Sequence, residues 1–146
     1  SRQKNEFIMK QLTESEVSIK SLIDIFDSAF VKVLDETADS FWIQGGNLKT
    51  KIRIDEKRKY LRFSIVYQLA VKPTLAEATR LANVINGEYL YIRFSAYESE
   101  GDLLLASDYY MTYEEGLVCF HLIKIGKRFE ELTVEALREY YNDYLS

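Results

Sequence analysis

The sequence predicts an α+β domain in which helices pack against an antiparallel sheet, with the elements in the order α-β-β-β-α-β-β-α. Three observations favour this class. Apolar residues recur at helical spacing in three segments, they alternate with polar residues in the segments between, and short polar turns separate these segments. The chain has 146 residues, 47% hydrophobic and 29% charged, as is usual for a globular chain with one core. We therefore expect a single domain over residues 1–146.

Each helical segment is associated with a Thr-x-x-Glu pair, the spacing of a capping box, in which two side chains accept unpaired amide hydrogens at a helix start. The helical patterns cover about 17–29, 75–86 and 118–136. Residues 1–12 are expected either to extend the first helix or to fray. The three pairs are Thr13 with Glu16, Thr74 with Glu77, and Thr112 with Glu115.

The segments between the helices alternate with a period of two, as strands with one buried face do. The pattern is clearest in "NLKTKIRID" and "YLRFSIVYQLAV". It leaves open whether "FVKVLDE" and "SFWIQ" form one bent strand or two. After Gly87, "EYLYIRFSAYE" and "LLLASDYYM" predict a hairpin. In the first of these two strands we expect Leu90, Ile92, Phe94 and Ala96 to face the core.

Two asparagines, Asn83 and Asn86, precede Gly87 at the end of the second helical segment. At about 100° per residue, Asn86 lies at the edge of the apolar stripe, and Gly87 stands where a left-handed residue commonly ends a helix. We interpret both amides as structural groups that bond backbone atoms where helix meets strand. The alternative is direct contact with a ligand.

Known catalytic and metal-binding patterns are missing from the sequence. His121 is the only histidine and Cys119 the only cysteine, and on a helix their side chains point about 200° apart, so they do not form a nucleophile and base. The sequence has neither a glycine-rich phosphate loop nor a paired-cysteine zinc pattern. We therefore expect no enzymatic activity, no catalytic residues, no metal and no cofactor.

Charge and hydropathy restrict the location and the partners. The net charge of −4 disfavours nucleic acid, because attraction to phosphates supplies most non-specific affinity. The sequence has no apolar run of the roughly 20 residues that span a membrane, and a lone cysteine fits a reducing compartment. We expect a cytoplasmic protein without membrane association. Because the chain begins at Ser1, an N-terminal segment removed beforehand stays an open question.

One basic stretch, residues 49–62, holds seven Lys or Arg against two acidic residues. Cations at alternate positions of a strand share a face, where they could bind an acidic peptide, a nucleotide or nucleic acid. They could equally keep an outer face or edge of the sheet solvated. Tyrosines on the same face would add contact area. The candidate partner-binding residues are Lys49, Lys51, Arg53, Arg62, Tyr89, Tyr91 and Arg93.

Three segments carry a resemblance to a known family: "RKYLRFSIVYQL", "EATRLANVINGEYLYIRFSAY", and "GDLLLASDYYM" followed by a helix. In these and in its element order, the chain resembles the YbjN family of proposed bacterial sensory transduction regulators, and more broadly the type III secretion chaperone-like fold. The resemblance covers roughly residues 13–137. It implies the α+β fold, no established catalysis and a homodimer like that of secretion chaperones. It transfers no catalytic residues.

The leading functional hypothesis is a non-enzymatic, homodimeric module that binds a protein segment, either as a chaperone or in a regulatory pathway. The alternative is a sensory domain that holds a small ligand between sheet and helix. A closed apolar pocket would favour the ligand, and an open surface would favour the protein segment. The sequence does not identify the pathway, the partner or the dimerising surface. The sheet and the last helix, which carries Tyr140, Tyr141 and Tyr144 near its end, are the candidate surfaces for dimerisation.

Overall fold

The computed structural model describes residues 10–145 of the chain and divides them into two compact units. Unit 1 comprises described residues 10–63 and 110–128, and unit 2 comprises residues 64–109 and 129–145. The single domain expected over residues 1–146 stays a prediction. The expectation of a frayed or helical start falls mostly on residues 1–9, which lie outside the described residues.

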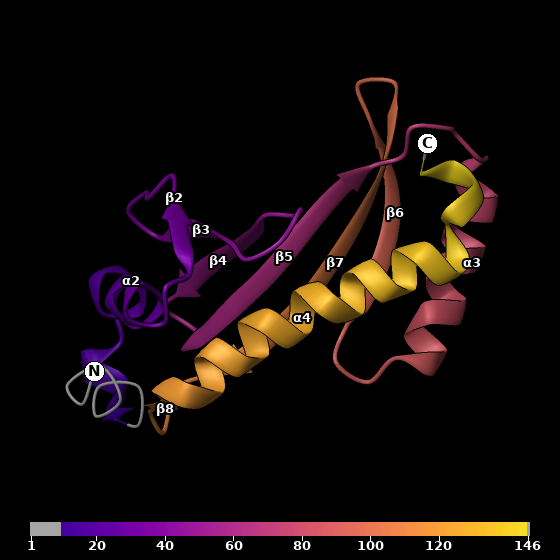
Figure 1. Cartoon of the computed structure of the whole chain (residues 1–146). Coiled ribbons are helices and arrows are strands. Elements are labelled where there is room, and N and C mark those ends of the chain that lie inside the picture. Colours follow the sequence, from indigo (N-terminus) through magenta and orange to yellow (C-terminus); the bar gives the residue numbers. More distant parts are fainter. Residues whose placement is uncertain (1–9, 146) are drawn as a thin grey trace. The chain divides into compact units, whose positions relative to one another are not determined.

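The elements confirm the α+β class (Figure 1). One sheet has the strand order β2-β3-β4-β5-β7-β6, and β1 pairs with β8 in a second, small sheet. The pairs β1–β8, β2–β3, β3–β4 and β6–β7 are antiparallel. The elements are β1 (Gln11–Leu12), η1 (Glu14–Glu16), α2 (Ile19–Ser28), β2 (Lys32–Leu34), β3 (Ser40–Gln44), β4 (Thr50–Asp55), β5 (Tyr60–Gln68), α3 (Leu75–Glu88), β6 (Arg93–Ser99), β7 (Asp102–Thr112), β8 (Leu117–Val118), α4 (Cys119–Tyr140) and η2 (Asn142–Tyr144).

Four strands, rather than the expected three, separate α2 from α3. The additional strand arises because "FVKVLDE" and "SFWIQ" form two strands, β2 and β3, which pair with each other from Lys32 opposite Gln44 to Leu34 opposite Trp42. A connection with Asp35 at φ 50° reverses the chain between them. The sequence pattern could not decide this, because alternation continues across a short bend.

The first helix begins later than predicted. Thr13 and Glu16 do form a cap, with the Thr13 amide donating to the Glu16 carboxylate at 2.9 Å, but the helix that follows is the short 3-10 helix η1. The longer α2 starts after Ser18, whose hydroxyl accepts from the Ser21 amide at 3.1 Å. Residues 11–12 neither fray nor extend this helix, because they form β1. A Ser-x-x-Ser pair therefore caps α2, whereas the Thr-x-x-Glu pair caps η1.

The last helix begins at Cys119, close to the start of its predicted pattern, but Thr112 does not cap it as expected. Thr112 is the final residue of β7, and its hydroxyl donates to the Lys59 carbonyl at 3.4 Å. A turn then leads to β8 through Gly116, which has φ 96°. A Cβ atom at Gly116 would lie 2.4 Å from the Leu12 carbonyl oxygen, so the close approach of β1 requires glycine here.

The core of unit 1 lies between α2, the first half of α4 and one face of the sheet. Leu22, Ile25 and Phe26 of α2 are buried, and the rings of Phe26 and Phe41 lie 5.9 Å apart. Gly126 of α4 lies at a close crossing, because a Cβ atom there would be 3.3 Å from Phe26 and from Ile43. Residues at alternate positions of β3 and β4 are all buried, namely Phe41, Ile43, Thr50, Ile52 and Ile54.

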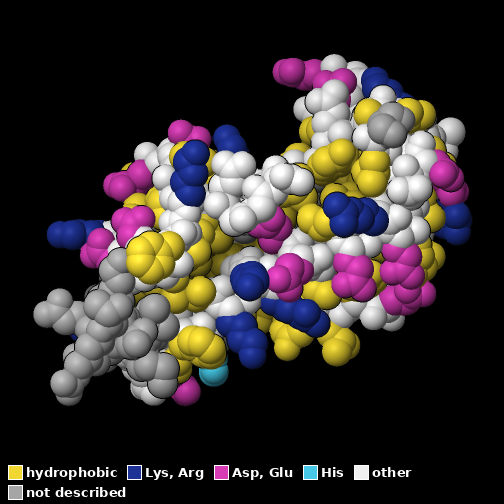
Figure 2. Space-filling model, viewed as in Figure 1, with side chains coloured by type: hydrophobic (Ala, Val, Ile, Leu, Met, Phe, Trp, Pro, Cys, Tyr) yellow, Lys and Arg dark blue, Asp and Glu magenta, His cyan; other side chains and the backbone are white. Residues whose placement is uncertain are grey.

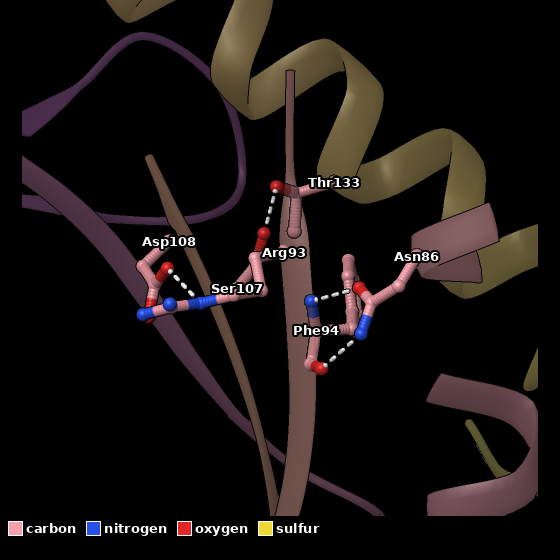
Figure 3. Close-up of polar contacts among 6 residues, drawn as sticks. All are labelled: Asn86, Arg93, Phe94, Ser107, Asp108 and Thr133. Carbon is pink, nitrogen blue, oxygen red and sulfur yellow. Dashed lines mark hydrogen bonds and ion pairs between the residues drawn. The ribbon is translucent and has the colours of Figure 1, made fainter. Parts of the chain in front are cut away.

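The core of unit 2 lies between α3, the end of α4 and its own part of the sheet. α3 begins where predicted, because the Thr74 hydroxyl accepts from the Glu77 amide at 3.1 Å. Tyr141 is fully buried, donates its hydroxyl to the Ala78 carbonyl at 2.7 Å, and stacks on Phe94 with ring centroids 6.4 Å apart. Buried hydroxyls of Ser107 and Thr133 lie 2.9 Å apart and join β7 to α4 (Figure 3).

The connection from α3 to β6 differs from the prediction. α3 continues through Gly87 to Glu88, and the glycines in the described chain with positive φ are Gly101 and Gly116. β6 begins only at Arg93, so Leu90, expected in the core, is 97% exposed. Ile92 and Phe94 are buried as predicted. Among the described residues, no helix has the length and apolar character needed to cross a membrane.

Candidate binding surface

A face of the sheet in unit 1, which we call the basic face, carries cations and aromatic rings. It is the face opposite Phe41 and Ile52, which pair in register and are fully buried. Trp42 and Lys51, the next pair in register, therefore point to the other side. The Lys51 ammonium lies 5.9 Å from the centre of the Trp42 ring, a distance typical of a cation–π contact.

A second cation–π contact extends the basic face onto β5 and β7. The Arg62 guanidinium lies 5.7 Å from the centre of the Tyr110 ring, and the rings of Tyr60 and Tyr110 meet edge to face at 5.1 Å. Arg62 alternates with Leu61 and Phe63, which are fully buried. The basic face consists of Trp42, Lys51, Arg53, Tyr60, Arg62 and Tyr110.

Two further residues set the charge of the basic face. Arg53 is exposed on β4, two positions beyond Lys51 and opposite the small Ser40. Asp55 lies at the end of β4, where the amide of Arg58 and its guanidinium donate to the Asp55 carboxylate at 2.9 and 3.2 Å. The amide hydrogen bond, aided by the guanidinium, lowers the pKa of Asp55. The Asp55 carboxylate is thus paired with Arg58, and Lys51 and Arg53 add positive charge to this face.

The structure places the predicted partner-binding residues in two groups. Lys51, Arg53 and Arg62 lie on the basic face, and Lys49 is exposed in the connection just before β4. Tyr89, Tyr91 and Arg93 belong to unit 2, and the two tyrosines precede β6 instead of alternating along it. Trp42, Tyr60 and Tyr110 of the basic face are absent from the predicted set. Alternation in "SFWIQ" could have identified Trp42, because it stands between the inward Phe41 and Ile43.

The three unit 2 residues of the prediction make contacts within their own unit. The Tyr89 hydroxyl donates to Glu139 at 2.8 Å, and burial, together with this carboxylate, raises the pKa of Tyr89. The Tyr91 ring lies 6.0 Å from that of Tyr109. Arg93 forms an ion pair with Asp108, its register partner on β7, at 3.1 Å (Figure 3). These contacts favour a structural role for the three residues.

Asn86 has the structural role predicted for it, but by a different geometry. Its side chain accepts from the Phe94 amide at 2.6 Å and donates to the Phe94 carbonyl at 2.9 Å (Figure 3). Because β6 is the last strand of the sheet, the amide takes the place of a neighbouring strand at this edge. Asn86 and Asn83 are exposed, so Asn86 does not face the core as expected.

Other features offer less for binding or chemistry. The Cys119 thiol is buried, and burial raises its pKa, so it is not an activated nucleophile. Within residues 10–145, no three His, Cys, Asp or Glu side chains gather in a way that could hold a metal. An open groove of about 580 Å³ lies in unit 1 between the start of α2 and residues 36–39, with Ile54 and Glu56 in its lining. It differs from the closed apolar pocket that the small-ligand hypothesis predicts.

Comparison with known protein structures identifies the fold of the chain. Neither a protein-family model nor a curated protein matches the sequence. The structure is similar to the crystal structure of YbjN, a proposed transcription regulator from E. coli, with a TM-score of 0.75 over 92% of this chain and 97% of that one. The chain has the fold of YbjN. At 14% identity the similarity concerns the fold, and the resemblance seen in the sequence is confirmed at that level.

Proposed function

We propose that the protein is a non-enzymatic binding module, chaperone-like or regulatory, and that it binds a protein segment on the basic face of unit 1. The observation that carries the proposal is the combination of three cations with three aromatic rings on a sheet face opposite the buried core. Tyr, Trp and Arg are the residues that dominate the energetics of protein interfaces. An open face of this kind suits a chain segment better than a small molecule, which prefers a concave site.

The environment of the reactive side chains supports a non-enzymatic role. Enzymes hold ionisable groups close together, with pKa values shifted toward their task. Cys119 is buried, and His121 is exposed beside Phe120 on α4. The described residues with lowered carboxyl pKa values, Glu16, Asp55 and Glu77, each pair with a group on their own turn or helix. Each of these shifts has a structural cause.

The test is a selection from a random peptide library against the wild-type protein and against the variant Trp42→Ala/Arg62→Ala. We expect peptides that bind the wild type and lose affinity for the variant, because the substitutions remove a ring and a cation from the basic face. The matched control is Phe120→Ala/Lys124→Ala, which removes a ring and a cation from exposed positions of α4. Peptides that bind all three proteins equally, or no selected peptides, would refute the proposal.

We also propose that the protein is a homodimer and that the open sheet face of unit 2 forms the interface. Tyr140 and Tyr141 serve inside unit 2, where they bond to Glu88 and Ala78 of α3, so the last helix is a weaker candidate. Val66 and Tyr97 point away from that core and are 51% and 39% exposed. Sedimentation equilibrium should give twice the monomer mass for the wild type and a lower mass for Val66→Glu. A monomer at every concentration would refute dimerisation.

A further inference from the structure

Two cations of the basic face lie over aromatic rings. Lysine and arginine side chains are normally mobile and lose about 1.5–2 kcal/mol of rotamer entropy when ordered. Here the Lys51 ammonium lies over Trp42 and the Arg62 guanidinium over Tyr110. The Trp42 ring thus orders the Lys51 side chain before any partner arrives, so binding an anion there costs less of this entropy.

The strand geometry spaces these cations regularly. Lys51 and Arg53 stand on one face of β4, and residues two apart in a strand are separated by about 6.6 Å. Arg62 stands on β5, the adjacent strand, which lies about 4.8 Å away. Side chains at alternate positions of an extended peptide have the same separation of about 6.6 Å. An extended segment with carboxylates at alternate positions therefore matches Lys51 and Arg53.

A peptide fits the basic face better than nucleic acid does. Single-stranded nucleic acid binds sheets by stacking bases on open ring faces, whereas Lys51 and Arg62 lie over two of the three rings. The net charge of the chain is −4, which opposes a long polyanion. Figure 2 shows Asp and Glu side chains over the C-terminal half of α4, where the exposed Glu131, Glu135 and Glu139 contribute to this negative net charge.

We propose that the segment bound by the basic face is an extended acidic peptide with Asp or Glu at alternate positions. This inference rests on the proposed function and specifies its partner. Lys51 and Arg53 bind successive carboxylates, and Trp42 and Tyr60 cover the apolar parts of the segment. Aromatic rings beside the cations exclude water and strengthen the ion pairs.

The test is fluorescence anisotropy with labelled probes: a peptide of alternating Glu and Thr, an isomer with all Glu followed by all Thr, an alternating Lys and Thr peptide, and oligouridine. The alternating acidic peptide should bind tightest. Lys51→Glu/Arg53→Glu should weaken the affinity for this peptide by about 2- to 30-fold, the range that two exposed ion pairs contribute. Lys124→Glu/Lys127→Glu, which makes the same charge change at exposed positions of α4, should leave the affinity within about 2-fold.

Three results would overturn the inference: equal affinity for the two acidic isomers, tighter binding of oligouridine, or no acidic peptide bound at all. If library peptides bind the basic face without alternating carboxylates, the inference fails and the proposed function stands. If no library peptide binds there, both fail. Lys51→Met/Arg53→Gln keeps the bulk without the charge, so loss of binding with an unchanged melting temperature separates recognition from folding.

Discussion

The outward sheet faces of the two units use the same residue types in different ways. In unit 1, Lys51 lies over a tryptophan ring and Arg62 over a tyrosine ring, and neither ring carries a charge. In unit 2, Arg93 is paired with Asp108, whose side chain is only 7% exposed. A cation on a strand thus meets a ring, as Lys51 meets Trp42, or a carboxylate, as Arg93 meets Asp108, according to its cross-strand neighbour.

The tyrosines show the same contrast and give the largest expected effect. Tyr141 in unit 2 is fully buried, whereas Tyr110 in unit 1 is 40% exposed. Tyr141→Ala should lower the free energy of unfolding by about 3–5 kcal/mol, because it empties a core position and removes a buried hydrogen bond. Tyr110→Ala should cost less than about 1.5 kcal/mol. Urea denaturation of both variants measures the difference, and equal losses would contradict the assignment of Tyr110 to a binding surface.

Asn86→Leu should have the next largest effect. It removes both hydrogen bonds to Phe94 at the edge of β6, and we expect a loss of about 1–3 kcal/mol in the free energy of unfolding. Asn83→Ala, at an exposed position of the same helix, should change it by less than about 0.5 kcal/mol. Thermal denaturation compares the two variants. Melting temperatures equal to that of the wild type for both would show that the Asn86 contact does not stabilise the edge.

Charge reversal on the two faces should give a smaller difference. Arg93→Glu places a carboxylate directly opposite Asp108 and should destabilise the protein by about 1 kcal/mol, since like charges across strands repel. Arg53→Glu faces the uncharged Ser40 and should change stability by less than about 0.5 kcal/mol. Chemical denaturation at low salt, where surface charges are least screened, provides the measurement. A larger loss of stability for Arg53→Glu than for Arg93→Glu would contradict the expected difference between the two faces.

Much of the fold follows from the sequence because each buried strand has one regular face. Alternation identified β4 and β5, and helical spacing identified the buried stripe of α3. Helix starts were harder to predict, because two of the capping motifs do not begin the expected α-helices. Thr13 caps a 3-10 helix, and Thr112 ends a strand. Local spacing does not report the tertiary contacts that decide this.

The candidate site could be predicted only in part. The cations of "KIR" indicated a basic strand face, but their aromatic partners come from other strands, so no local pattern contains them: Trp42 precedes Lys51 in the chain, and Tyr110 follows Arg62. Tyr89 and Tyr91 were assigned to the same strand as Arg93 because alternation continues beyond the true strand start. The pairing of Arg93 with Asp108 depends on the register of the β6–β7 hairpin, which the sequence alone did not fix.

The most direct test of the central claim is to map the binding surface by NMR, with the alternating Glu and Thr peptide added to isotope-labelled protein. We predict chemical-shift changes concentrated at the amides of β3, β4 and the part of β5 in unit 1, and on the Trp42 indole. The amides around Arg93 and Asp108 in unit 2 should change little. Changes confined to unit 2, or the same changes in the Lys51→Glu/Arg53→Glu variant, would contradict the assignment of the basic face as the binding surface.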